Sequence, residues 1–271
     1  MDLSEERFSD IASNKKMNTI KVNIKDKIAV LSLDRGRSNA INSEMVSELH
    51  QMIRNIENDD TIAGLILTGK DGFFSAGLDL IELYDYDEDQ IKEFWIEFLS
   101  LVTSMVSFKK PMIAAISGHS PAGGCVLALS CDYRIMAEGK FIIGLNEVPV
   151  GIIVPESIFH LYAFWLGNAK AHRALLEGKL MHTQEALSVG LIDEVVSPES
   201  ILHAAERKML TYIKLERKTW QLSKMNIREE LLKKVSADQS EMLRHMLEQW
   251  WSPSTRSILK TIIQNLQQKS S

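Results

Sequence analysis

The sequence predicts a mixed α and β domain that continues into a helical C-terminal region. Apolar and polar residues alternate over Ile20–Lys25, and the apolar run Ile28–Leu33 follows a two-residue turn, so these segments predict a β-hairpin. Apolar residues then recur at helical spacing over residues 45–56. From Glu199 onward the pattern is predominantly helical, with a break near residues 251–254. No linker rich in Pro, Gly or Ser separates an independent domain.

Composition limits the class of protein. The 271 residues are 45% hydrophobic and 25% charged, which is typical of a soluble globular chain with one large domain or two small ones. The net charge of −5 gives no general electrostatic footprint for nucleic acid, so we expect a small-molecule partner instead. No apolar run approaches the roughly eighteen residues that span a bilayer, and the acidic segment MDLSEERFSD differs from signal and transit peptides. We therefore expect no membrane partner and a cytoplasmic location.

Local signals place the elements of the first half of the chain. Asn42 or Ser43 has the side chain to cap the helix that contains residues 45–56. The runs Gly64–Thr68 and Met112–Ile116 are apolar and predict buried strands.

A long helix is expected between these two strands. Asp87 and Gln90 have the spacing of a capping box at its start. One broad apolar face follows, made of Ile91, Phe94, Trp95, Phe98, Leu99, Val102 and Met105. A stripe of this kind is usually part of the core.

The second half shows shorter helical segments. These are expected at residues 157–166, 170–176 and 183–189. Gly190 suits the C-cap of the last one. The segment LIDEVVSPES then predicts a short strand, after which Ser197 caps a helix with Pro198 in its first turn.

A Pro-Ala-Gly-Gly turn opens an apolar helical run within ISGHSPAGGCVLALSCDYRI. Pro121 suits a first helical turn, and Gly123 and Gly124 leave backbone N–H groups uncovered at a helix N-terminus, which attracts negative charge. A single carboxylate, Glu147, follows in an otherwise apolar segment. Backbone donors beside a carboxylate suit proton transfer next to a carbonyl, because the donors hold the developing oxyanion while the carboxylate moves the proton. Close packing is the alternative role for the glycines.

A second turn lies in GFFSAGLDL, residues 72–80, directly after the predicted strand Gly64–Thr68. A strand that ends in a Gly-containing turn and then starts a helix presents free N–H groups. Here these groups belong to Ser75, Ala76, Gly77 and Leu78. Two such turns can supply two donors to one oxygen.

Several residue types are assigned no chemistry. Cys125 and Cys131 lack metal-ligand spacing and predict reduced, buried thiols. The seven histidines show no HExxH or comparable spacing, so no metal site is expected, and His119 reads as a structural or solvated residue. The nucleotide-binding and serine-hydrolase sequences GxxxxGK[ST], GxGxxG and GxSxG are absent.

Three blocks in order, FSAGLDL, PAGGCVLALSCDYRI and IGLNEVPVGI, resemble the enoyl-CoA hydratase/isomerase (crotonase) superfamily, most closely its mitochondrial-type 3,2-trans-enoyl-CoA isomerases. The resemblance is clear over residues 20–196. It implies an α/β fold, a crotonase-like ββα spiral with a C-terminal helical region. We accordingly expect a flexible tail at residues 1–16, the spiral core at 17–198 and a helical oligomerisation region at 199–271.

The resemblance also implies roles for particular residues. The Leu78 and Gly123 N–H groups would bind the oxygen of an acyl-CoA thioester, and Glu147 would shuttle the proton. Arg37 would lie near the coenzyme A phosphates, and Ala40 would contact coenzyme A through its backbone. Further substrate-binding residues would be Ala76, Gly77, Asp79, Leu80 and Asn146. Part of the aromatic stripe would line a tunnel for the acyl chain.

A count of carboxylates favours an isomerase over a hydratase. Enoyl-CoA hydratases of this family use two glutamates, and the first of their positions is Val126 here. Moving the double bond of a 3-enoyl-CoA to the 2-trans position, a step of fatty acid β-oxidation, needs one carboxylate and no cofactor beyond the coenzyme A of the substrate. An inward orientation of Glu156 would restore a second carboxylate. A hydratase or another crotonase-family acyl-CoA enzyme, and a non-catalytic binding protein, are the alternatives.

The C-terminal region predicts assembly. The family packs its C-terminal helices at subunit interfaces, so a homotrimer, or two trimers paired into a hexamer, is expected. The apolar positions at helical spacing are Met242, Leu243, Met246, Trp250, Trp251, Ile258, Leu259, Ile262, Ile263 and Leu266. Packing onto the core of their own subunit is the alternative.

Overall fold

Two β-sheets form the centre of this computed structural model, which describes residues 17–270; the predicted tail at residues 1–16 lies outside the described residues. The larger sheet has the strand order β1-β2-β3-β5-β7-β10. Its strands are β1 (Ile20–Lys25), β2 (Ile28–Leu33), β3 (Gly64–Thr68), β5 (Met112–Ile116), β7 (Tyr133–Ala137) and β10 (Glu194–Val196). The β1–β2 pair is antiparallel, and the other neighbours are parallel.

The β1–β2 hairpin confirms its prediction. Lys25 pairs with Ile28, so the connection has two residues. Asp26 and Lys27 have φ of 51° and 66°. Positive φ at both central positions matches the right-handed twist of the flanking strands, which explains why this tight turn closes the hairpin.

The smaller sheet has the order β4-β6-β8-β9. Its strands are β4 (Gly72–Phe73), β6 (Gly118–Pro121), β8 (Ile142–Gly144) and β9 (Leu180–His182). Pro121 therefore ends a strand, and the prediction that it lies in the first turn of a helix is wrong. Pro121 pairs with Gly144 as the last residue of β6, where the missing N–H of proline interrupts the ladder least.

Helices account for most of the remaining chain. They are α2 (Ser43–Asn58), α3 (Leu80–Tyr84), α4 (Glu88–Ser107), α5 (Gly123–Leu129), α6 (Glu156–Leu166), α7 (Asn168–Glu177), α8 (Thr183–Val189), α9 (Ile201–Ile213), α10 (Arg217–Ile227), α11 (Glu229–Val235), α12 (Ser240–Trp250) and α13 (Pro253–Ser270), with 3₁₀ turns η1 (Val148–Val150) and η2 (Pro198–Ser200). Asn42 caps α2, and Asp87 and Gln90 form the predicted capping box of α4. Ser197 is a different case, because its hydroxyl bonds the Ser200 hydroxyl rather than a backbone N–H.

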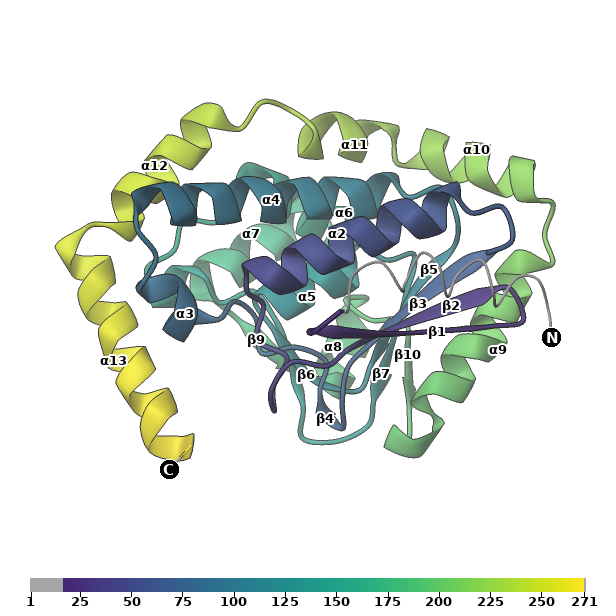
Figure 1. The fold of residues 1–271 in the computed structure, drawn as a ribbon, viewed down its shortest axis with the longest axis horizontal. Coiled ribbons are helices and arrows are strands. Elements are labelled where there is room, and N and C mark those ends of the chain that lie inside the picture. The colour runs from purple at the N-terminus through teal and green to yellow at the C-terminus, as the bar shows by residue number, and fades with distance from the viewer. Residues whose placement is uncertain (1–16, 271) are drawn as a thin grey trace.

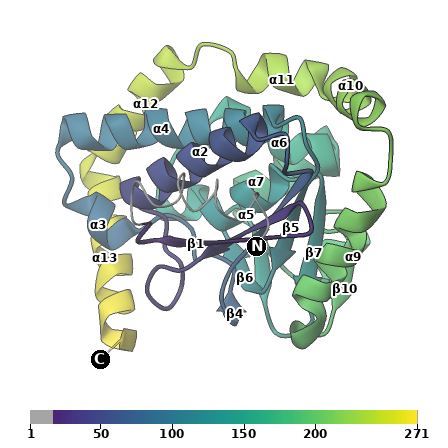
Figure 2. The same ribbon diagram turned by 45° about the vertical axis from the view of Figure 1, so that its right-hand side comes forward.

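The helices cover the sheets from several sides (Figure 1). Helices α2 and α4 pack against each other over the central core, and all the apolar residues predicted to face inward from both are buried. Helix α9 covers strands β3, β5 and β7 with a second apolar cluster. Helices α10, α11 and α12 then arch over the top, and α13 descends beside α3 (Figure 2).

A buried ion cluster fastens this arch to the larger sheet. Lys224 Nζ lies 2.8 Å from Asp132 Oδ2, and Arg228 Nη2 lies 3.0 Å from Oδ1. Asp132 Oδ2 also accepts a hydrogen bond from the Met112 N–H. Burial lowers the pKa of Lys224 to about 8, and the Asp132 carboxylate opposes that shift. Asp132 thus supplies the counter-charge of two buried cations.

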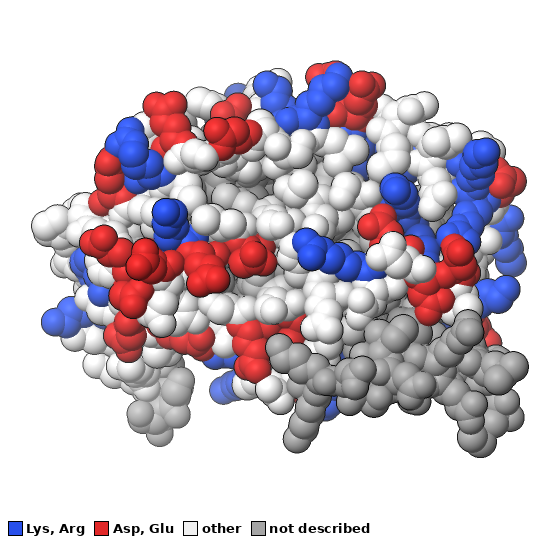
Figure 3. Space-filling view, turned by 45° about the horizontal axis from the view of Figure 1, so that its top comes forward, with Lys and Arg blue, Asp and Glu red and all other residues white. Residues whose placement is uncertain are grey.

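Charged side chains of both signs are interspersed on the face shown in Figure 3.

Four of the apolar residues predicted to lie at subunit contacts are instead buried in the core of their own chain, namely Leu243, Met246, Trp250 and Leu259. For these four the subunit-interface prediction is wrong, because α12 and the first half of α13 pack inward. Ile258 and Leu266 remain exposed.

Replacing Asp132 with Asn should destabilise the protein by roughly 3–5 kcal/mol, because two buried cations would lose their counter-charge. Urea unfolding at pH 7 measures this change. Asp60→Asn is the matched control, since the Asp60–Arg217 pair is exposed and should matter little. Equal unfolding midpoints for the two variants would contradict the role of the cluster.

Candidate active site

A cavity of about 430 Å³ opens between the two turns that the sequence singled out. The loop after β2, the turn after β4, helix α4, the start of α5, the segment before η1, helix α6 and helix α13 all contribute to its wall. Much of its wall is apolar and includes Val126, Trp95, Phe98, Val150, Ile152 and Ile158. The cavity is therefore suited to a ligand with a hydrophobic portion.

The backbone amides of Leu78 and Gly123 lie near each other where these turns approach closely. A Cβ at Gly77 would lie 2.9 Å from the Ala122 Cβ, and one at Gly123 would lie 3.5 Å from the Leu78 nitrogen. Among the described residues, neither the Leu78 N–H nor the Gly123 N–H donates to a protein acceptor. Both residues line the cavity, so the two amides are available to one oxygen.

Specific backbone bonds fix the two turns. Leu78 forms a parallel bridge with Ile41, in which Ile41 N–H donates to Gly77 O and Asp79 N–H to Ile41 O, each at 2.8 Å. Ala122 adopts φ of 49° and donates its N–H to Gly144 O at 2.8 Å. A non-glycine residue rarely adopts this conformation, and strained backbone concentrates at functional sites.

The sequence had also assigned free N–H groups to the three residues before Leu78, and this prediction is wrong. Ser75 N–H donates to His119 O, Ala76 N–H to Ser38 O, and Gly77 N–H to the Ser75 hydroxyl. These hydrogen bonds fix the turn up to Gly77. Only the amide of Leu78 is left for a ligand.

Glu147 is the titratable group of the cavity. It precedes η1, and its carbonyl accepts from the Val150 and Ile152 N–H groups, which turns the chain so that the side chain enters the protein. Its Oε2 is buried with no hydrogen-bond partner. Burial raises the pKa of Glu147 to about 7. The carboxyl is thus near the point where it exchanges protons at neutral pH.

The other carboxylate on the cavity wall, Asp79, is paired. Arg35 Nη1 lies 2.6 Å from Asp79 Oδ2, and Arg35 Nη2 lies 2.7 Å from Glu82 Oε2. Arg35 also donates to the Ala40 carbonyl at 3.0 Å. This arginine holds the loop after β2 against the start of α3, a role that the sequence analysis missed because the pairing joins residues far apart in the chain.

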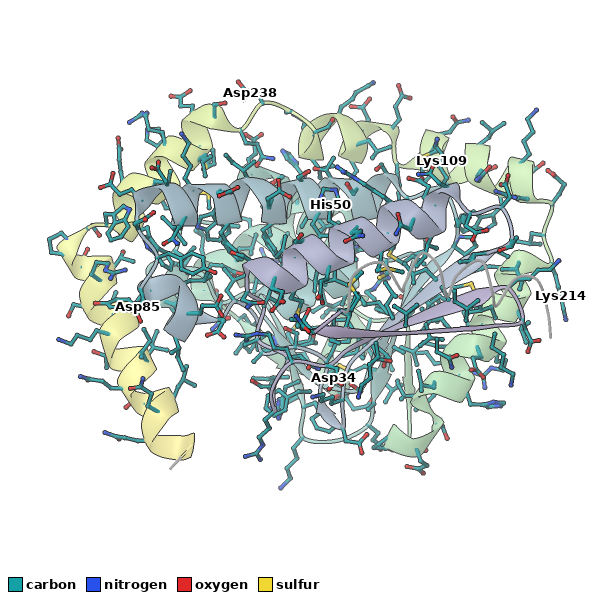
Figure 4. All side chains as sticks on the ribbon, viewed as in Figure 1. Asp34, His50, Asp85, Lys109, Lys214 and Asp238 are labelled. Carbon is teal, nitrogen blue, oxygen red and sulfur yellow. The ribbon has the colours of Figure 1, made fainter. Side chains whose placement is uncertain are left out.

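Two lysines also hold the loop after β2 in place. Asp34, at its start (Figure 4), pairs with Lys21 and Lys70, and these two lysines lower the pKa of Asp34. Lys70 Nζ also donates to Gly36 O at 2.8 Å. Arg37 lies on the cavity wall in the same loop.

Nine of the ten predicted site residues line this one cavity: Glu147, Leu78, Gly123, Ala76, Asp79, Leu80, Asn146, Arg37 and Ala40. Gly77 lies behind them, where its positive φ and missing Cβ permit the close approach to Ala122. Trp95 and Phe98 of the aromatic stripe reach the cavity, as does Ile262 of α13, which the sequence analysis had assigned to a subunit contact.

Glu156 and His119, which the sequence also singled out, lie outside the cavity wall. The side chain of Glu156 is 64% exposed and pairs with His160 at 3.1 Å, so it adds no second carboxylate to the cavity. His119 lies between the rings of Phe73 and Phe141, and its Nδ1 accepts from the Ile142 N–H. Burial lowers the pKa of His119, as expected for a structural histidine.

Residues 17–270 contain no cluster of three or more potential metal ligands. Within the same part of the chain, no helix has the length and apolar character needed to cross a membrane.

Comparisons with known proteins agree with this geometry. The family model "Enoyl-CoA hydratase/isomerase" matches residues 23–263. Enoyl-CoA delta isomerase 1, mitochondrial, of Mus musculus is 38% identical over 214 residues, 78% of this chain and 72% of the relative. A probable enoyl-CoA hydratase of Rhizobium meliloti is 31% identical over 189 residues, 69% of this chain and 72% of the relative.

A solved structure extends the match to the fold. The crystal structure of human mitochondrial delta3-delta2-enoyl-CoA isomerase superposes with a TM-score of 0.90 at 29% identity, covering 94% of this chain and 100% of that one. The predicted α/β fold, a crotonase-like ββα spiral with C-terminal helices, is confirmed. The mouse relative's name refers to mitochondria, whereas the cytoplasmic location expected here stays a prediction.

Glu147 should make the protein less stable as the pH rises through 7. Its folded-state pKa, about 7, lies above the ordinary 4.5, so the stabilisation is complete below pH 4.5 and is lost as the pH rises through 7. Relative to Glu147→Gln, the wild type should lose about 3 kcal/mol of unfolding free energy between pH 4.5 and pH 8. Urea unfolding across this range measures the difference. Glu156→Gln, at an exposed position, should follow the wild type throughout, and a pH-independent difference for Glu147→Gln would contradict the burial of its charge.

Proposed function

The chain belongs to the enoyl-CoA hydratase/isomerase (crotonase) family, and we propose that it is an enoyl-CoA isomerase of fatty acid metabolism, acting in β-oxidation. In this reaction the double bond of a 3-enoyl-CoA moves to the 2-trans position. One observation carries the proposal: Glu147 is the single unpaired carboxylate on the cavity wall, and Val126 stands where hydratases of the family have a second one. A proton moved within one molecule needs only one acid/base group, whereas adding water needs two.

The thioester oxygen lies between the Leu78 and Gly123 N–H groups. As the enzyme removes a proton from C2, negative charge moves onto this oxygen, and two fixed donors stabilise it. A single donor of this kind contributes about 3–4 kcal/mol in the transition state. The dipole of so short a helix as α5 adds little, so the two amides themselves supply the stabilisation.

Glu147 moves the proton in both halves of the reaction. Its carboxylate removes a proton from C2, and the electrons delocalise over a dienolate that extends from the thioester oxygen to C4. The carboxylic acid then returns the proton to C4, and the double bond forms between C2 and C3. No atom is gained or lost, and the carboxylate is regenerated. A pKa of about 7 allows the group to accept and release the proton with little thermodynamic penalty.

The rest of the cavity binds the remaining parts of an acyl-CoA. Arg37 and the backbone around Ala40 serve the coenzyme A portion at the rim, while Ala76, Asp79, Leu80 and Asn146 contact the thioester and pantetheine. The apolar part of the wall holds the acyl chain. No other cofactor enters this scheme.

Assembly into a homotrimer, or a hexamer of two trimers, belongs to the same proposal, with residues 199–271 as the oligomerisation region after a spiral core at 17–198. Exposed Ile258 on α13 supports it, as does an apolar surface groove that contains Val148 and Leu176. Light scattering at micromolar concentration should report three or six times the mass of one chain; a monomer would contradict the assembly.

Substituting Gln for Glu147 should reduce isomerase turnover of 3-enoyl-CoA by roughly 10²–10⁴-fold while coenzyme A thioesters still bind, because the amide keeps the shape and removes the base. A coupled assay with 3-enoyl-CoA substrates of several chain lengths, run beside 2-enoyl-CoA hydration, measures both activities. Glu156→Gln serves as the control and should retain full activity. Near-wild-type turnover by Glu147→Gln, or faster hydration than isomerisation by the wild type, would reject the proposal.

The pH dependence of kcat/KM should report the titration of Glu147. The base must be deprotonated in the free enzyme, so kcat/KM should rise with pH and level off above about 7. Steady-state assays between pH 5.5 and 9 test this expectation. A kcat/KM that stays flat over this range would show that the functional carboxylate is not the buried one.

A further inference from the structure

A second cavity, of about 190 Å³, lies among the β1–β2 turn, the segment between α2 and β3, the residues just before β5, the end of α9 and the start of α10. Helices α9 and α10 lie at the opposite side of the molecule from α3 and α13, which border the proposed active site (Figure 1). No described residue lines both cavities. The second cavity is therefore a separate site.

Lys110 is the buried cation of this cavity wall. Its side chain is 2% exposed, and its ammonium donates to the Ile56 carbonyl at 2.6 Å and to the Asp59 carbonyl at 2.5 Å, both at the end of α2. An ammonium has three N–H donors, so these bonds fix Lys110 and leave one donor unused. In the part of the chain that the structure describes, no carboxylate forms an ion pair with Lys110, and the carboxylate of Asp59 accepts from Thr61 instead. Because a buried cation without a counter-charge is costly, an anion in the cavity would stabilise this group.

The other charges of the wall also favour an anion. Lys27 and Arg217 line the cavity together with Lys110, and the acidic residue of the wall, Asp60, is paired with Arg217 at 2.7 Å. Burial, and then the charge of Arg217, lower the pKa of Lys110. A negative charge between these cations would reduce their mutual repulsion.

The rest of the wall is largely apolar. The rings of Tyr212 and Trp220 have their centroids 5.8 Å apart, and Pro111, Ile213 and Leu215 extend this apolar surface. Pockets for drug-sized ligands have volumes of about 300–1,000 Å³, so a cavity of about 190 Å³ admits a smaller molecule. A single ring that bears a carboxylate matches the size, the buried cation and the aromatic surface.

We propose that this cavity binds a small aromatic carboxylate, whose carboxylate accepts a hydrogen bond from the third N–H of Lys110 and whose ring packs against Tyr212 and Trp220. An inorganic anion would leave the apolar wall without a partner, and a neutral ring would leave the ammonium without one. The inference is independent of the proposed isomerase function, because the two sites have no lining residue in common.

Titration with benzoate, followed by isothermal calorimetry, tests the proposal. The wild type should bind one benzoate per chain, and Lys110→Met should bind it roughly tenfold or more weakly, because the hydrogen-bonded charge is lost while most of the side-chain stem remains. Benzyl alcohol and benzylamine, which carry the same ring, should bind the wild type more weakly than benzoate by a similar factor. Lys109→Met changes the neighbouring exposed lysine (Figure 4) and is the matched control, with the affinity of the wild type. The absence of saturable benzoate binding, or unchanged affinity in Lys110→Met, would overturn the inference.

A second variant decides the matter if circular dichroism shows that Lys110→Met does not fold. Trp220→Leu removes a half-buried ring of the wall and should weaken benzoate binding by about threefold to tenfold, whereas unchanged affinity would contradict the proposal. Saturating coenzyme A should leave benzoate binding in the wild type unaltered. Competition between the two would place benzoate in the active-site cavity and would refute this inference without touching the proposed isomerase function.

Discussion

The close approach of two backbone turns at Gly77 and Ala122 is the constraint on which the site depends. Without a Cβ at Gly77 the turns come near enough for the Leu78 and Gly123 amides to face one point. The parallel bridge from Ile41 and the bond from Ala122 to Gly144 hold each turn to a different sheet neighbour. The two amides proposed to bind the thioester oxygen are therefore fixed by backbone hydrogen bonds, and no side chain has to be ordered when a ligand binds.

The same architecture supports a buried carboxyl at some expense in stability. Burial disfavours the charged form of the Glu147 carboxyl, and the strained backbone of Ala122 is a second unfavourable contribution. The extensive core under α2 and α4 offsets these terms. Proteins commonly combine a well-packed, stable core with a functional site that is itself destabilising.

The sequence predicted what local pattern determines. The β1–β2 hairpin, the Asn42 cap and the apolar faces of α2 and α4 follow from periodicity and capping within a few residues, and all four are present. The two turns around the cavity were also recognisable, because three blocks of residues resemble a known family.

What could not be predicted depends on contacts between distant segments. Pro121 was assigned to a helix because a proline before an apolar run looks the same at a helix start and at a strand end. The pairing of Arg35 with Asp79 and Glu82, and the inward packing of Trp250 and Leu259, join parts of the chain that have no common local signal. Nothing in the sequence indicated the positive φ of Ala122, because glycine is the residue expected in that conformation.

The ion cluster at Asp132 has a consequence for the order of events on the ribosome. Its partner Lys224 lies 92 residues later in the chain, so at 5–20 residues per second the carboxylate waits on the order of 5–20 s for its cations. Strands β5 and β7, which flank Asp132, cannot close over an unpaired charge without penalty during that interval. Co-translational folding should therefore pause with the β5–β7 part of the larger sheet hydrated, and the packing of α10 and α11 over it would be a late step.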